Sequence, residues 1–393
     1  MTVTRRVPFQ KPAKPYRFRL FLWQNNRNIG GMKSLLVIFF LSIYITARPQ
    51  RSENIIIITT DGLRWQEVFS GMDSAIANNP KFNEEDSAYL FKKYWATTPD
   101  ERRKKLLPFL WNTIVTNGQI YGNRNLGDKM DNANPYWFSY PGYSELMTGN
   151  ADTAINSNSF VANPHITVLE YLNKKPKLKG KVVAFGAWNA FDRILNEERS
   201  GIPVICGLQP TGGKNPTANE KMINALLKDA YRPWHEDECF DVFTHYAAME
   251  WLKVRRPRVI YIAYGETDEW AHAGKYRSYL DAASQVDAWI KTLWDFIQKD
   301  PQYKNKTTIL FTTDHGRGDI NKEEWTSHNN KIQDAHEIWM ALTGPGVPVI
   351  GESVGEQIYQ QQIAQTIAKL LGYTYQANHS IAPEILPVFK KKK

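Results

Sequence analysis

Asp314 and His315 stand side by side in the stretch Thr307–Gly318, whose first half is apolar and β-branched. That first half has the composition of a buried strand in a parallel sheet, and the two polar residues follow where the strand should end. Open α/β sheets bind their ligands at this end of the strands. A carboxylate beside an imidazole suits Zn²⁺ and related divalent ions. A polar turn after a strand has the same sequence, so the pair needs partners before it predicts a metal site.

Two further apolar runs also end in groups that bind metals. Asn54–Thr60 leads directly into Asp61, and Arg258–Tyr264 leads into a segment that carries Asp268 and His272. Asp268 and His272 are four residues apart, so one helical turn would direct both side chains toward one point, as metal-ligand pairs on helices require. Three strands that end in acidic or imidazole groups predict a shared site at one edge of a sheet.

The formal charge of +9 does not describe the body of this 393-residue chain. Residues 1–47 contain eight Lys or Arg and no acidic residue, and the chain ends in the four lysines Lys390–Lys393. Without these charges the remainder is slightly negative. A basic surface for nucleic acids is therefore not expected.

A short basic start followed by an apolar run predicts a signal peptide at residues 32–47. Met32 and a lysine precede the apolar run Ser34–Ile45, and small residues ending in Ala47 follow it. This order is typical of secretory signals, and the run is short for a membrane span. We therefore expect residues 1–31 to be a mis-called upstream extension and the exported chain to start near Arg48, periplasmic or secreted, without a stable membrane span. An uncleaved anchor is the alternative.

Export would place Cys206 and Cys239 in an oxidising compartment. A disulfide between them and a pair of free thiols both remain open. The sequence also leaves the oligomeric state open.

Strand-like and helix-like segments alternate through most of the chain. Lys181–Gly186 is a short apolar run, whereas Tyr276–Lys299 carries apolar residues at helical spacing. This alternation predicts a three-layer α/β/α sandwich with a mostly parallel central sheet. We expect one catalytic domain over residues 48–389, with a small cap insertion around residues 187–239, and a basic tail at 390–393. Further helices are expected at Leu107–Asn117, Thr167–Asn173, Asn219–Lys228, Phe240–Lys253 and Gly355–Leu371, and further strands at Gln119–Tyr121 and Glu337–Thr343.

Ser139 lies in an aromatic segment that offers a nucleophile. The run Tyr136–Tyr140 reads as extended, Pro141-Gly142 should break it, and Tyr143–Thr148 can start a helix. A serine at such a junction can turn its hydroxyl toward a metal while backbone N–H groups face an anion. A serine before Pro-Gly is also an ordinary turn residue.

The order of these groups along the chain resembles the alkaline phosphatase superfamily, especially its nucleotide pyrophosphatase/phosphodiesterase branch. The resemblance extends from about Asn54 to Leu371. In that branch a Thr or Ser nucleophile lies two residues before a Pro, and a Thr-Gly follows on its helix. Ser139 before Pro141 and the pair Thr148-Gly149 match this pattern.

The resemblance implies two metal sites, which two Zn²⁺ ions or alternatively Mn²⁺ would fill. A later histidine completes the first site, and His328 fits the family's spacing before Gly344-Pro345 better than His336 does. The implied first site is Asp268, His272 and His328, and the implied second site is Asp61, Asp314, His315 and the Ser139 oxygen.

The resemblance also implies hydrolysis of a small phosphoester through Ser139 and a phosphoseryl intermediate. Asn156 and Asn158 lie where related enzymes place an amide near the phosphoryl oxygens, and Arg64 and Arg317 follow ligand motifs and could add positive charge. The family's usual Asn-His after the Pro is replaced here by Gly142-Tyr143, so its substrate contacts do not transfer.

Three alternatives remain open. A sulfatase of the superfamily would need an Arg two residues after Pro141, where Tyr143 stands. A cofactor-independent phosphoglycerate mutase shares the metal plan but works in the cytosol. A secreted glycan-binding protein could use the many Trp and Tyr residues and keep a metal for structure only.

Overall fold

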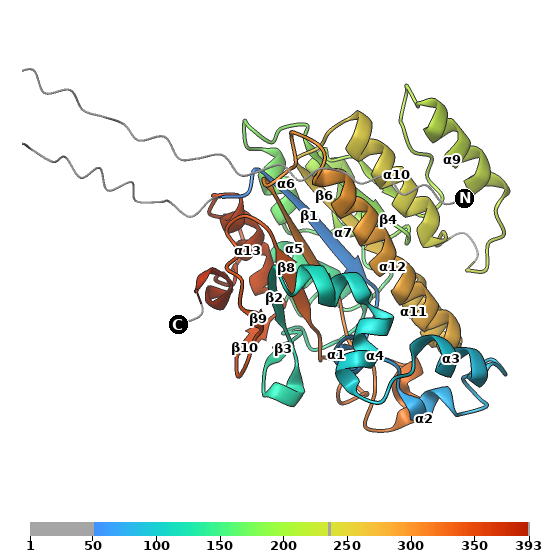
Figure 1. Cartoon of the computed structure of the whole chain (residues 1–393). Helices are drawn as coiled ribbons and strands as arrows, with labels where there is room; N and C mark the ends of the chain where they lie inside the picture. Colours follow the sequence, from blue (N-terminus) through green and yellow to red (C-terminus); the bar gives the residue numbers. More distant parts are fainter. Residues whose placement is uncertain (1–50, 235–236, 392–393) are drawn as a thin grey trace, which may run out of the picture. The chain divides into compact units, whose positions relative to one another are not determined.

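The computed structural model describes residues 51–234 and 237–391, and these form an α/β fold around a large sheet (Figure 1). In this part of the chain the sheet has eight strands in the order β5-β4-β6-β1-β7-β8-β2-β9. Their bounds are β1 Asn54–Thr60, β2 Gly118–Tyr121, β4 Val182–Gly186, β5 Val204–Cys206, β6 Val259–Tyr264, β7 Thr307–Thr313, β8 Met340–Thr343 and β9 Gly351–Glu352. β3, Lys129–Asp131, pairs with β10, Gln357–Tyr359, in a separate small sheet.

The three central strands end side by side. β1 pairs in parallel with β6 on one side and β7 on the other, and every residue of all three is buried. Thr60, the last residue of β1, lies opposite Tyr264 in β6 and Thr313 in β7. The residues that follow these strands therefore emerge together at one edge of the sheet, as the sequence predicts.

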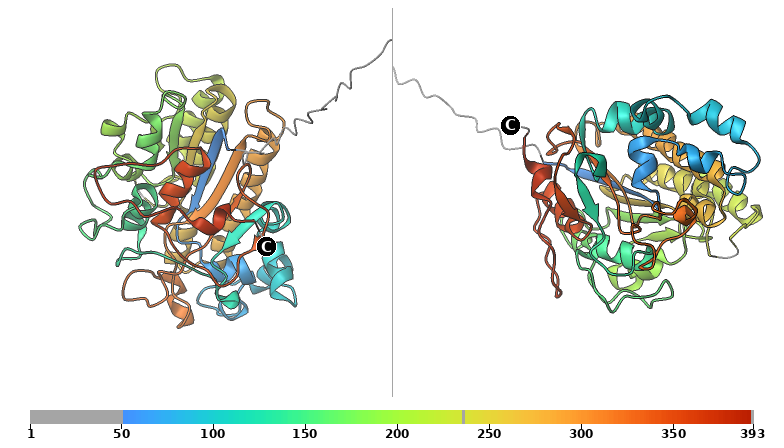
Figure 2. Two further views of the ribbon diagram at one scale, coloured as in Figure 1. Left: turned by 90° about the vertical axis from the view of Figure 1, so that its left-hand side faces the viewer. Right: turned by 90° about the horizontal axis from the view of Figure 1, so that it is seen from below.

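Helices cover both faces of the sheet, which confirms the predicted layered α/β fold (Figure 2). The longer helices are α3 Ser87–Tyr94, α4 Pro99–Leu106, α5 Ser139–Thr148, α9 Ala218–Asp229, α10 Asp241–Val254, α12 Tyr276–Ile297 and α13 Gln362–Leu370. The shorter helices are α1 Trp65–Ser70, α2 Ser74–Ala77, α6 Val168–Asn173, α7 Phe191–Ile194, α8 Glu197–Ser200 and α11 Glu266–His272. Single helical turns of other types are η1 Leu110–Ile114, η2 Arg124–Leu126, η3 Lys322–Thr326 and η4 Leu386–Phe389.

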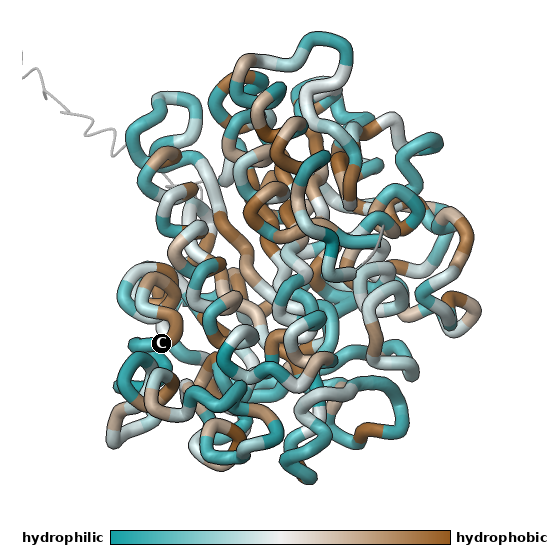
Figure 3. The backbone as a smooth tube through the Cα atoms, turned by 90° about the vertical axis from the view of Figure 1, so that its right-hand side faces the viewer, coloured by the Kyte–Doolittle hydropathy of each residue, from teal (hydrophilic) through white to brown (hydrophobic). Residues whose placement is uncertain are grey.

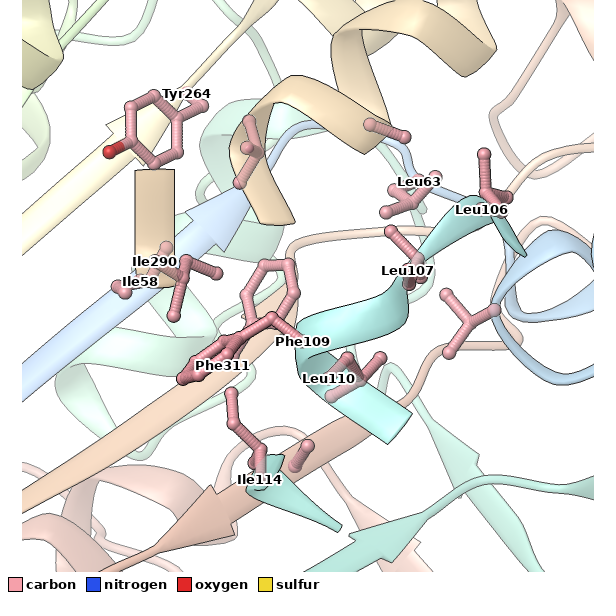
Figure 4. Close-up of a cluster of buried hydrophobic side chains, with 14 of the residues drawn as sticks. Ile58, Leu63, Leu106, Leu107, Phe109, Leu110, Ile114, Tyr264, Ile290 and Phe311 are labelled. Atoms are coloured by element: carbon pink, nitrogen blue, oxygen red, sulfur yellow. The ribbon is translucent and has the colours of Figure 1, made fainter. Parts of the chain in front are cut away.

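Alternate residues of the central strands pack into two separate hydrophobic cores, one on each face of the sheet. Ile56 and Ile58 of β1 pack toward α10 and α12, whereas Ile55 and Ile57 pack toward α5, α6 and α13. Figure 4 shows Ile58 in the first core with Phe311 of β7 and Ile290 of α12. The tube of Figure 3 shows the helices with brown, apolar stretches alternating with teal, polar ones, the pattern of helices buried on one side. Burial of both faces explains why these strands read as continuous apolar runs.

Several predicted elements differ from those observed. The predicted break at Pro141-Gly142 is wrong, because α5 begins at Ser139 and continues through both residues. Pro141 lies in the first helical turn, where a missing N–H removes no intrahelical hydrogen bond. Three further segments are shorter or of another type. The helix expected at Leu107–Asn117 is a π-helical turn only at Leu110–Ile114. β10 and α13 replace the single helix expected at Gly355–Leu371, and β8 starts at Met340 rather than Glu337.

The segment 187–239, expected as a cap insertion, contributes both to the sheet and to a flanking helix. Its strand β5 pairs with β4 at one edge of the sheet, and its helix α9 lies against α10. Cys206 and Cys239 are both buried and not bonded to each other. Within residues 51–234 and 237–391, none of the helices combines the length and apolar character of a membrane span. The expected signal peptide lies outside the described residues.

Candidate active site

The first candidate metal site joins the ends of β1 and β7. Asp61, Asp314 and His315 offer ligand atoms that lie within 4.8 Å of one another, and all three residues are buried. His315 Nε2 lies 3.2 Å from Asp61 Oδ1 and 3.4 Å from Asp314 Oδ2. His315 Nδ1 faces the Gly316 carbonyl oxygen at 2.9 Å, and donation there leaves Nε2 as the ligand atom. The structure thus brings together three residues that the sequence assigned to one site.

Two glycines let the backbone approach this site closely. Gly62 has φ +56°, and a Cβ there would lie 2.8 Å from Arg317 Nε and 3.0 Å from Asp268 Oδ1. A Cβ on Gly142, in the first turn of α5, would lie 2.6 Å from the Asp314 carbonyl oxygen. A larger residue at either position would force the site apart. Gly142 in particular allows α5 to pack directly against the end of β7.

Close packing of α5 brings Ser139 to the metal-ligand cluster. Ser139 is the first residue of α5, and its Oγ lies 3.4 Å from His315 Nε2. Asn158 accepts a hydrogen bond from the Tyr140 N–H through Oδ1 at 3.0 Å, which leaves its Nδ2 free to donate elsewhere. Asn156 is exposed and makes no hydrogen bond to α5 within the described part of the chain. Of the two asparagines, Asn158 is the one next to Ser139.

The second candidate metal site is centred on Asp268 of α11. Asp268 Oδ2 lies 3.2 Å from His272 Nε2, one helical turn away, and Asp268 Oδ1 lies 3.6 Å from His328 Nε2. The two histidines approach each other to 2.9 Å between their Nε2 atoms. Asp268 and His328 also form a ligand cluster with His315, so the two candidate sites adjoin. The helical turn predicted from the spacing of Asp268 and His272 is present.

His328 rather than His336 faces this second site. His328 Nδ1 lies 3.3 Å from the Trp137 carbonyl oxygen, so that donation there would direct the lone pair of Nε2 toward Asp268. The ring of His336 instead packs at a tilt against Trp137, with ring centroids 4.9 Å apart, and its Nε2 lies 3.6 Å from Asp131 Oδ1. This geometry supports the choice of His328 made from the sequence.

The chemistry of these residues fits divalent metal ions. Asp61 Oδ1 and Asp314 Oδ2 are buried and accept no hydrogen bond from the described residues, and such acceptors are costly unless a cation or a proton satisfies them. Burial, together with the Asp61 charge, raises the pKa of Asp314 well above its usual value. Burial lowers the pKa of His315, but the nearby charges of Asp314 and Asp61 outweigh it and bring that pKa to about 9. Without a metal, protons therefore occupy positions that a metal would take.

Two buried side chains contact candidate metal ligands. Tyr143 is fully buried, and its hydroxyl donates to Asp61 Oδ2 at 3.0 Å. Arg317 is 1% exposed, and its Nη2 donates to Asp268 Oδ1. Burial alone would raise the pKa of Asp268, but the Arg317 charge and His272 hold it well below its usual value. The other arginine noted in the sequence, Arg64, is paired with Glu67.

A family model described as type I phosphodiesterase / nucleotide pyrophosphatase matches residues 110–390. The chain belongs to this family. The matched region includes Ser139, Asp268, His272, the pair Asp314-His315 and His328, and it begins after Asp61. Membership makes the protein a hydrolase of the alkaline phosphatase superfamily, as the resemblance predicts. No curated protein matches the chain significantly.

Solved structures similar to this phosphodiesterase-family chain support the same fold. The alkaline phosphatase PafA is 9% identical, with a TM-score of 0.55 over 88% of this chain and 100% of that chain. A 2-O GAG sulfatase is 13% identical, with a TM-score of 0.52 over 87% of this chain and 75% of that one. The lipoteichoic acid synthase LtaP from Listeria monocytogenes is 12% identical, with a TM-score of 0.50 over 83% and 73% of the two chains. At these identities the likeness concerns the fold.

The sequence did not reveal what two residues of this phosphodiesterase-family site contact. Position 143 stood out because it carries neither the histidine usual in the phosphodiesterase branch nor the arginine of sulfatases, and its bond to Asp61 spans 82 residues of sequence. Arg317 was noted for its place after Asp314-His315, but its pairing with Asp268 depends on how the ends of β6 and β7 meet. A sequence search could find a tyrosine and an arginine beside the ligand motifs, but it could not give their contacts with Asp61 and Asp268.

Proposed function

We propose that this protein hydrolyses phosphate esters with Ser139 as nucleophile and two divalent metal ions as cofactors. The observation that carries this proposal is the position of the Ser139 hydroxyl, 3.4 Å from Nε2 of His315, within the cluster that Asp61 and Asp314 complete. A turn role alone does not account for a serine hydroxyl beside the imidazole that adjoins both of these buried carboxylates.

Two Zn²⁺ ions, or Mn²⁺ in their place, would lower the pKa of the Ser139 hydroxyl and offset negative charge on the reacting oxygens. Asp61, Asp314 and His315 would hold one ion beside the Ser139 oxygen, and Asp268, His272 and His328 the other. The anionic carboxylates and the neutral Nε2 atoms of the histidines are the forms that bind such ions.

The residues of α5 would position the reacting phosphorus. Ser139 Oγ gives its proton to solvent and forms a bond to phosphorus while the P–O bond to the ester oxygen breaks and the alcohol leaves. Water then attacks phosphorus, the phosphoseryl bond breaks, phosphate is released and the Ser139 hydroxyl is restored. Asn158, which holds the Tyr140 N–H through Oδ1, has its Nδ2 available for a phosphoryl oxygen. A hydrogen-bond donor at this position stabilises the negative charge that develops on the phosphoryl oxygens as Ser139 Oγ approaches phosphorus.

Diesters or pyrophosphate-type bonds should be cleaved at least as well as monoesters. Classical alkaline phosphatases place an Asp before their nucleophile to help hold a third metal, whereas Phe138 precedes Ser139 here. Loss of a nearby cation penalises a monoester, which carries one more negative charge than a diester. Tyr136, Trp137 and Phe138 are all partly exposed next to Ser139 and offer an apolar surface to an esterifying group.

A sulfatase is the second candidate, because a sulfatase is among the similar structures. The residue where the superfamily's sulfatases carry an Arg is Tyr143, whose side chain is buried against Asp61 rather than directed at a substrate. This observation favours phosphate over sulfate esters.

The test is turnover of matched aryl phosphate monoesters, aryl phosphate diesters and an aryl sulfate by zinc-loaded protein. We expect phosphoester cleavage with kcat/KM for the diester at least equal to that for the monoester. A monoester preference above a hundredfold, roughly 2.7 kcal/mol, contradicts the diester assignment. Cleavage of the sulfate alone contradicts the proposed function.

The matched variant is Ser139→Ala, which should bind the same amount of metal and lose turnover. Retention of more than a tenth of wild-type kcat, a difference of roughly 1.4 kcal/mol, would contradict the role of Ser139. We also propose that the protein is exported, and N-terminal sequencing of the exported chain should find a start near Arg48. An N-terminus that retains Ser34–Ile45 would instead indicate a membrane anchor.

A further inference from the structure

Arg317 is a buried cation inside the candidate metal centre. Its side chain is fully buried, and Asp268 is the only carboxylate within ion-pair distance of it in the described part of the chain. Nη2 donates to both the Oδ1 and the main-chain oxygen of Asp268, the latter at 3.1 Å. Arg317 Nε and Nη1 donate no hydrogen bond to any residue in 51–234 or 237–391. The guanidinium is therefore not held by another acid that would neutralise it.

The carboxylate of Asp268 is shared among four neighbours, namely Arg317, His272, His328 and His315. Oδ2 faces His272 at 3.2 Å, while Oδ1 takes the Arg317 contact and also faces His328 at 3.6 Å. An arginine remains charged at any relevant pH. Asp268 Oδ1, one of the two carboxylate oxygens, is therefore always in contact with a positive charge. A metal ion bound there must share Oδ1 with the guanidinium.

The neighbouring site has no such competitor. In the described residues, neither Asp61 nor Asp314 forms an ion pair with a lysine or arginine, and each has one buried oxygen without a hydrogen-bond partner. Asp61 is instead held by the neutral hydroxyl of Tyr143. A neutral hydrogen-bond donor orients a carboxylate ligand and leaves its negative charge available to the metal ion. A guanidinium instead offsets the negative charge of the carboxylate and repels the metal cation.

We propose that Arg317 makes the position formed by Asp268, His272 and His328 the weaker of the two metal positions, so that it fills last and empties first. This inference rests on the proposed two-metal function and assigns Arg317 a role in metal affinity. The protein would then exist in a one-metal form over a range of free metal concentrations. Activity, which needs both ions, would follow the weaker site.

The test is a zinc titration of metal-free protein by calorimetry, with bound metal counted by elemental analysis. Wild-type protein should bind two ions in two steps whose dissociation constants differ at least tenfold. Arg317→Met, which also removes two unpartnered buried donors, should tighten the weaker step at least tenfold and leave the tighter one nearly unchanged. Arg317→Lys keeps the charge and should retain the unequal steps.

Further outcomes separate this inference from the proposed function. Asp61→Asn should weaken the tighter binding step and leave the weaker step unchanged. This result would assign the tighter step to the site of Asp61 and the weaker step to the site of Asp268. Equal affinities in wild-type protein, or weaker zinc binding in Arg317→Met, would overturn the role of Arg317 while two-metal binding still stands. Wild-type protein that binds no metal would overturn the proposed function itself.

Discussion

Tyr143→Phe removes one oxygen atom from the candidate active site and tests how Asp61 is held. The Tyr143 hydroxyl donates to Asp61 Oδ2 at 3.0 Å, and the side chain is fully buried, so water cannot replace the lost donor. A hydrogen bond to a charged group contributes about 1.5–3 kcal/mol. If this bond keeps Asp61 in place for the metal, its loss should weaken zinc binding at that site by about 10- to 100-fold.

Tyr261→Phe is the matched control for this experiment. Tyr261 is also fully buried, and its hydroxyl bonds to Thr59 Oγ1 at 2.9 Å rather than to a metal ligand. Both variants should lower the melting temperature by a few degrees, because each leaves one buried polar atom without its partner. Only Tyr143→Phe should change the zinc dissociation constant, measured by calorimetry. Equal zinc affinity in wild-type protein and Tyr143→Phe would refute a role for Tyr143 in positioning Asp61.

Three further predictions follow from other parts of the structure. His328→Ala should lose about one metal per chain in elemental analysis, whereas His336→Ala should keep both, since only His328 faces Asp268; the reverse result would move the ligand to His336. Chelation should lower the melting temperature of wild-type protein, because bound metal stabilises only the folded state; no shift would argue against resident metals. Burial raises the pKa of Asp287 to about 7, so its contribution to folding stability should be full below its ordinary value near 3.8 and be lost as pH rises to 7. The free energy of unfolding of wild type minus that of Asp287→Asn should therefore fall between pH 4 and pH 7, and a flat difference would show that Asp287 is not so perturbed.

The central strands and the proximity of two pairs of candidate ligands could be predicted from the sequence because their signals are local. A strand buried on both faces reads as an unbroken apolar run, and Asn54–Thr60 is such a run with the observed bounds. The residues that follow parallel strands share one edge of the sheet, which brings Asp61 and Asp314 together. The spacing of Asp268 and His272 likewise needs only one turn of helix.

What the sequence missed depends on contacts between distant segments. Pro141-Gly142 was expected to end an extended run ahead of the helix, yet both residues lie in the first turn of α5, and Gly142 lets the helix meet the Asp314 carbonyl. Neither the bond from Tyr143 to Asp61 nor the pairing of Arg317 with Asp268 has a local signature. Such contacts become visible only when the strand ends and α5 are placed in space.

The most direct test of the proposed mechanism is to trap the covalent intermediate. Zinc-loaded protein is mixed with an aryl phosphate monoester labelled in its phosphoryl group, quenched rapidly in acid and analysed by peptide mass spectrometry. The proposal predicts a phosphoryl group on Ser139, which lies 3.4 Å from His315 Nε2, and no label in Ser139→Ala. Full turnover with no label on the protein, or with label on another residue, would contradict it.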